Sequence, residues 1–82
     1  MEKRSTMEEL MEVLSALKPE IDFTKEKELI DEGLLESFDV ITLIAELEDQ
    51  FGVEIPAEEI VPENFNSAEG IWRLLERMKE EA

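Results

Sequence analysis

The 82 residues of the chain include 23 acidic and 8 basic side chains, which gives a formal net charge of −15. This charge argues against binding to a nucleic acid or an anionic membrane, because both need lysine and arginine. It favours partner proteins that carry basic patches. Since the chain has no cysteine and no histidine, it has no disulfide, no thiolate metal site and no histidine base.

Hydrophobic residues make up 43% of the chain, which is more than an acidic disordered tail contains. Length and composition therefore predict one small globular domain over residues 1–82. The first ten residues lack the apolar core of a signal peptide, and no apolar run approaches the roughly 20 residues of a membrane helix. We therefore expect a cytoplasmic protein.

A first helix is predicted over Met7–Leu17, where apolar residues recur at helical spacing. Ser5 and Thr6 each precede a glutamate by three residues, which is the pattern of a capping box. Pro19 follows the expected end of the helix.

A long loop is predicted over Lys18–Glu36, where apolar residues show no regular period. Loops of this length are uncommon in compact domains and are usually functional or held by their own side chains. Gly33 permits a turn. The side chains expected to hold the loop are Ile21, Phe23, Leu29, Ile30, Leu34 and Leu35.

A second helix is predicted to begin at Ser37 and to run to Phe51, with Gly52 after its end. The structural alternative to a chemical role for Ser37 is that it caps this helix. One face is apolar: Phe38, Ile41, Ile44, Leu47 and Phe51, widened by Val40 and Leu43. Of these, Ile41, Ile44, Leu47 and Phe51 are expected to pack in the core. Another face is expected to meet water or a partner: Asp39, Thr42, Glu46 and Asp49.

The remainder predicts an extended piece at Val53–Ile55 and a short helix at about Ala57–Ile60 that Pro62 stops. Asn66 and Glu69 form the capping-box pattern of a last helix that ends near Lys79. Its apolar residues are Ile71, Leu74, Leu75 and Met78, with Trp72 partly buried beside them. The order of elements predicts a small all-α bundle.

Ser37 is the candidate for chemistry, but the chain offers nothing to activate it. A serine hydroxyl needs a base, and the lysine nearest to Ser37 in the sequence, Lys27, lies in a polar loop. The calcium-loop spacing D-x-D-x-D-G is absent, so we expect no catalytic residue and no metal site. The first turn of a helix does favour a phosphate group. The position therefore suits a serine that another enzyme modifies with a phosphate-linked group.

The run Glu36-Ser37-Phe38-Asp39 resembles the D-S-L-D-type motif of acyl carrier proteins. Further matches follow where that family has its L…LE…F…IP pattern: Leu43, Leu47, Glu48, Phe51, Ile55 and Pro56. Leu29-Ile30-Asp31 and Gly33-Leu34-Leu35 resemble the family's approach to the serine. The resemblance extends over residues 7–78.

The resemblance implies a four-helix bundle with a long first loop and a short third helix. It also implies that a phosphopantetheinyl transferase moves 4′-phosphopantetheine from coenzyme A onto Ser37. The thiol of this arm would hold an acyl or aminoacyl group as a thioester. The implied partners are that transferase, a loading ligase and downstream transferases with basic patches. The chain itself would be a monomer and not an enzyme.

The resemblance also makes the second helix the docking element, and all basic residues lie before position 28 or after position 72. Lysine and arginine of a partner would meet its acids, and two residues would make an apolar contact. For Phe38 the alternative is core packing, and for the acids it is simple solvation. The full docking set is Glu36, Phe38, Asp39, Thr42, Ala45, Glu48 and Asp49.

Four positions of the chain depart from the family pattern. Glu36 replaces aspartate, Phe38 replaces leucine, Thr42 stands where an acid is frequent, and Ala45 where a bulky apolar residue is frequent. Partners are therefore not assumed to match those of fatty-acid synthesis. The GLL before the serine and the FGV after the second helix resemble D-alanyl carrier proteins better.

Three alternatives remain open from the residues alone, besides an enzyme, which is the least favoured. The chain is a carrier modified on Ser37, an interaction module of the same fold with unmodified Ser37, or an acidic adaptor that binds a basic protein. The cargo is also open: a fatty acyl, D-alanyl, other aminoacyl or polyketide group.

Overall fold

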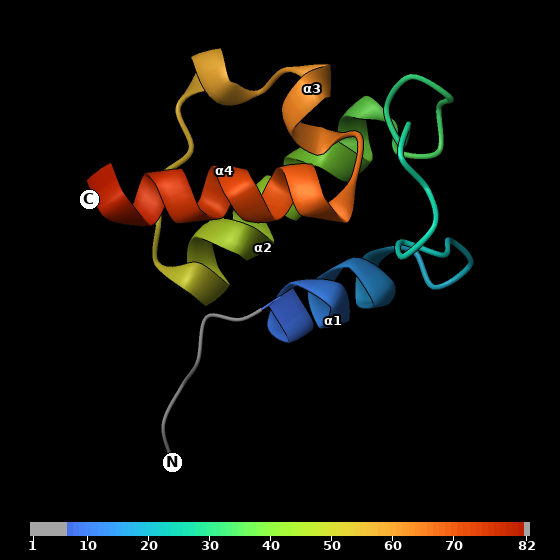
Figure 1. Cartoon of the computed structure of the whole chain (residues 1–82), viewed down its shortest axis with the longest axis horizontal. Coiled ribbons are helices and arrows are strands. Elements are labelled where there is room, and N and C mark those ends of the chain that lie inside the picture. The colour runs from blue at the N-terminus through green and yellow to red at the C-terminus, as the bar shows by residue number, and fades with distance from the viewer. Residues whose placement is uncertain (1–6, 82) are drawn as a thin grey trace.

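The computed structural model describes residues 7–81, and all regular secondary structure within that range is helical (Figure 1). Its elements are α1 (Met7–Leu17), α2 (Ser37–Phe51), the 3₁₀ helix η1 (Ala57–Glu59), α3 (Pro62–Phe65) and α4 (Ala68–Glu81). The all-α fold and the bounds of the first two helices are as predicted. Within the same residues, no helix is both long and apolar enough to cross a membrane.

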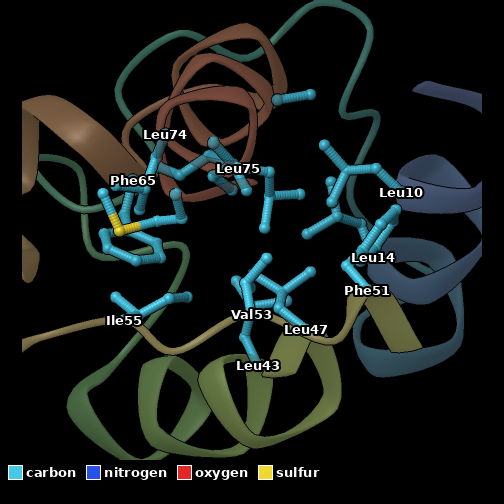
Figure 2. Close-up of a cluster of buried hydrophobic side chains, with 14 of the residues drawn as sticks. Leu10, Leu14, Leu43, Leu47, Phe51, Val53, Ile55, Phe65, Leu74 and Leu75 are labelled. Atoms are coloured by element: carbon cyan, nitrogen blue, oxygen red, sulfur yellow. The ribbon is translucent and has the colours of Figure 1, made fainter. Parts of the chain in front are cut away.

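The core lies where α1, α2 and α4 meet. α1 packs against both α2 and α4, and α3 packs against α4. Figure 2 shows leucines of all three long helices pointing into this space. Those with fully buried side chains are Leu10, Leu14, Leu43, Leu47, Leu74 and Leu75. Burial of this apolar area is the main force that holds so acidic a chain together.

The long loop is held by its own side chains, as predicted. Phe23, Leu29 and Leu35 are buried in the same core, and Ile21, Ile30 and Leu34 pack against it. In Figure 1 this loop (cyan to green) leads into the first turn of α2.

The core face of α2 lies further round the helix than the sequence predicted. Leu43, Leu47 and Phe51 are buried, and Val40 and Ile44 are partly buried. Ile41, which was predicted to pack in the core, is 65% exposed, and Phe38, on the same apolar face of the predicted helix, is 77% exposed. The apolar residues cover too wide an arc for one core contact, and the edge of that arc faces outward.

α2 ends at Phe51 and is capped by Gly52, as predicted. This glycine has φ of 66°, a left-handed conformation that glycine adopts without strain, and its N–H donates to the Glu48 carbonyl at 3.0 Å. The extended piece follows, with Val53 and Ile55 buried and Glu54 exposed. It stays close to α2 because the Ile55 N–H donates to Glu48 Oε2 at 3.0 Å.

In the last third of the chain, the structure differs from four predictions of where helices begin and end. The short helix is a 3₁₀ turn at Ala57–Glu59, and Pro62 begins α3 because proline suits a first helical position. The cap of α4 is Ser67, whose Oγ accepts the Gly70 N–H at 3.0 Å, and not Asn66. α4 continues to Glu81, beyond the predicted end near Lys79.

Two further predictions have different outcomes. Trp72 is partly buried as expected, and its ring meets Phe51 edge to face with centroids 6.3 Å apart. The predicted capping box of α1 begins at Ser5 and Thr6, which lie outside the described residues.

Candidate modification site at the start of α2

Ser37 is the first helical residue of α2 and not its cap. Glu36 occupies the cap position with extended backbone (φ −97°, ψ 172°), and its N–H donates to Asp39 Oδ2 at 3.1 Å. The alternative that Ser37 caps the helix is therefore wrong, because its two acidic neighbours take the capping roles. Ser37 itself is exposed, and its hydroxyl has no hydrogen-bond partner among the described residues.

A lysine from the end of α1 moderates the negative charge around the serine. Lys18 Nζ lies 3.4 Å from Asp39 Oδ2 and 3.7 Å from Glu20 Oε2. The charge of Asp39 and its hydrogen bond raise the pKa of Lys18 above the ordinary value of 10.5. The pair ties the end of α1 to the first turn of α2.

This pair gives a pH-dependent prediction. Because the pKa of Lys18 is raised on folding, the pair stabilises the fold below about pH 10.5 and the stabilisation is lost as pH rises through the folded pKa. Asp39→Asn should lower the pKa of Lys18, and Glu20→Gln should lower it less. Alkaline NMR titration of the Lys18 side chain measures both. Equal Lys18 pKa values in wild type and Asp39→Asn would show that the pair does not form in solution.

An apolar pocket of about 540 Å³ opens directly beside Ser37. The loop contributes Ile30 and Leu35, and α2 contributes Val40 and Ile41. Phe65 of α3 is part of the same lining. This pocket could not be predicted from the sequence, because the residues that line it come from segments far apart in the chain and no local pattern connects them.

Exposed apolar side chains flank the same site. Besides Phe38 and Ile41, they include Ile60 at 40% and Val61 at 36% exposure. The core-packing alternative for Phe38 is therefore wrong. The sequence pattern did not predict that Ile41 is a surface residue. The signal that could have shown this is that α2 has more apolar residues than one core face can bury.

The predicted docking residues do not all share one environment. Glu36, Phe38, Ala45 and Asp49 are exposed. Asp39, Thr42 and Glu48 are partly buried. Thr42 lines a groove between α1 and α2, and the carboxylates of the other two accept internal backbone N–H groups. At helical spacing, Phe38, Ile41, Ala45 and Asp49 lie on one side of α2; we call these four residues the outer face.

Comparison with known proteins identifies the family. The family model described as "Phosphopantetheine attachment site" matches residues 6–75. The chain belongs to this family of phosphopantetheine carrier proteins. Its members hold 4′-phosphopantetheine as a covalent cofactor.

Curated relatives bear carrier names. The chain is 41% identical over 54 residues to aminoacyl carrier protein 1 of Bradyrhizobium diazoefficiens, a match covering 66% of the chain and 59% of that relative. It is 32% identical to the D-alanyl carrier protein of Bacillus velezensis, covering 88% of the chain and 95% of the relative. It is 29% identical to that of Lactococcus lactis, covering 90% and 96%.

The surroundings of Ser37 fit the cofactor of the family. Its hydroxyl is exposed and free to form an ester. It stands at the N-terminus of a 15-residue helix, where unpaired N–H groups and the helix dipole favour a phosphate. When attached, phosphopantetheine supplies a thiol, a group that a carrier without cysteine lacks.

Proposed function

We propose that the protein carries acyl or aminoacyl groups as thioesters on 4′-phosphopantetheine attached to Ser37 Oγ, and delivers them to partner enzymes. The observation that carries this proposal is the exposed, unbonded hydroxyl of Ser37 at the start of α2, in a chain of this family. The names of the relatives favour an aminoacyl cargo, D-alanyl included, over a fatty acyl one.

The chain presents the serine and leaves activation to another protein. The sequence has no histidine, and among the described residues no basic group is hydrogen-bonded to the Ser37 hydroxyl. Its Oγ would form the new bond to phosphorus as the pyrophosphate bond of coenzyme A breaks. Adenosine 3′,5′-bisphosphate would leave, and the serine proton would pass to a base of the transferase. The chain is therefore proposed to be a carrier and not an enzyme.

The partners follow from this role. They are a phosphopantetheinyl transferase, a ligase that loads the cargo, and downstream transferases with basic patches, all acting on a cytoplasmic monomer. Charge attraction between such patches and the base-free segment Glu28–Trp72 would speed encounter more than it tightens binding. Fast release suits a carrier that visits several enzymes.

Three residues of the outer face of α2, Phe38, Ile41 and Ala45, are proposed as the apolar part of the docking surface. Phe38 is adjacent to Ser37 in sequence and is 77% exposed, so it is available to a partner. Burying a phenylalanine side chain stabilises a complex by about 1.5–3 kcal/mol.

Phe38→Ser should lower kcat/KM of the modifying transferase roughly 10- to 100-fold, since about 1.4 kcal/mol corresponds to a factor of ten. Steady-state kinetics with varied carrier concentration measures this. Phe38→Leu is the control, because it keeps an apolar side chain and should retain most of the activity. If Phe38→Ser keeps the wild-type kcat/KM, Phe38 is not part of the docking surface.

The proposal as a whole is tested by intact mass spectrometry. Wild-type protein is incubated with coenzyme A, magnesium and a broad-specificity phosphopantetheinyl transferase, with coenzyme A omitted as control. We expect a gain of one phosphopantetheine. No gain with several transferases, on a sample shown by circular dichroism to be folded, would leave a carrier-fold interaction module with unmodified Ser37.

A further inference from the structure

Asn66, between α3 and α4, binds the long loop with its side chain and its backbone. Its Oδ1 accepts the N–H groups of Ile30 at 2.8 Å and Asp31 at 3.1 Å. Its Nδ2 donates to Asp31 Oδ2 at 3.1 Å, and its backbone carbonyl accepts the Leu29 N–H at 2.8 Å. One residue therefore holds three consecutive loop residues.

The held segment is bonded in turn to the residues that lead into Ser37. The Leu29 carbonyl accepts the Leu35 N–H at 3.0 Å, and the Ile30 carbonyl accepts the Gly33 N–H at 3.0 Å. Leu29 and Leu35 are both buried. Residues 29–35 thus form a closed turn, fixed at one end by Asn66 and ending two residues before the serine.

The same turn also shapes the surface around the serine. Ile30, Gly33 and Leu35 line the apolar pocket together with Ser37. A change in the turn therefore alters both the backbone that leads into α2 and one side of the pocket.

We propose that Asn66 is a positioning residue for the modification of Ser37: it clamps residues 29–31 and so fixes the approach to the serine. This inference rests on the proposed carrier function. Ordering a long loop costs conformational entropy, so without the clamp the approach samples more conformations. If the transferase binds only the clamped form, its apparent affinity for the carrier is the intrinsic affinity multiplied by the fraction of molecules in that form.

The first test compares Asn66→Ala with Ser67→Ala. The control removes a neighbouring hydrogen bond, that of Ser67 Oγ with the Gly70 N–H, which does not involve the loop. Transferase kinetics should show KM for the carrier raised about tenfold in Asn66→Ala, with kcat nearly unchanged, as expected when few molecules are competent to bind. Ser67→Ala should keep the wild-type KM. Amide hydrogen exchange of Ile30, Asp31 and Leu35 should accelerate in Asn66→Ala only.

The second test exchanges the side chains of Asn66 and Asp31, which are hydrogen-bonded to each other. Asn66→Asp places two carboxylates together and should raise KM, whereas Asn66→Asp combined with Asp31→Asn restores a donor and an acceptor and should recover the wild-type KM. This comparison still decides the question if Asn66→Ala does not fold.

Three results would overturn the positioning role: a wild-type KM in Asn66→Ala, an equal rise in Ser67→Ala, or no recovery in the exchanged pair. All three require a wild-type protein that is modified. A wild type that is not modified at all would instead contradict the proposed function.

Discussion

Replacement of Ser37 by alanine is expected to abolish phosphopantetheine addition while changing the free energy of unfolding by no more than about 0.5 kcal/mol, as for most exposed substitutions. The modification is lost because the accepting hydroxyl is lost. Stability is retained because Glu36 and Asp39, and not Ser37, make the contacts at the start of α2. Intact mass spectrometry and urea denaturation measure the two effects on one sample.

Ser67→Ala is the matched control for this prediction. Ser67 Oγ accepts the Gly70 N–H as the cap of α4, so its loss should cost about 1 kcal/mol of stability and leave modification intact. A loss of about 1 kcal/mol in Ser37→Ala would instead show that Ser37 caps α2 in solution. Continued modification of Ser37→Ala would show that another residue accepts the group.

Leu47→Ala is expected to lower the free energy of unfolding by about 2–5 kcal/mol, because it leaves a cavity among leucines of three helices. Leu47 is 0% exposed. Figure 2 shows its side chain among the buried side chains of the core. The free energy of unfolding of small domains is about 5–15 kcal/mol in total, so this variant should be close to unfolding. The shift in denaturant midpoint measures the effect.

Ile41→Ala separates the observed core face of α2 from the predicted one. Ile41 is 65% exposed, so its truncation should change stability by only about 0.5 kcal/mol. If Ile41→Ala is as destabilising as Leu47→Ala, the core face of α2 lies where the sequence pattern placed it and the outer face is wrongly assigned.

The long helices could be predicted because local signals determine them. Helical spacing gives their length, Pro19 follows the end of α1, and Gly52 ends α2. The phase of α2 could not be predicted because its apolar residues cover a wider arc than one core contact can bury. Periodicity shows that such a helix is amphipathic, but only the packing of α1 and α4 decides which part of the apolar arc is buried. Phe38 and Ile41 are the part left outside.

The candidate site was found from its motif, but its local geometry was not. A serine before an apolar run is a good cap, but in the structure Glu36 and Asp39 form the capping box of α2 instead. The prediction that Asn66 caps the last helix was wrong for a different reason. Its pattern with Glu69 is local, whereas the bonds that it makes reach residues 29–31, which are distant in the sequence. Contacts of this kind leave no local pattern.

Fragmentation mass spectrometry of the modified wild-type protein tests the central claim most directly. It locates the added group without any substitution, and so without any change in folding. We expect every modified molecule to carry phosphopantetheine on Ser37. Phosphopantetheine on another hydroxyl, such as that of Ser15 or Thr42, would contradict the assignment of the site.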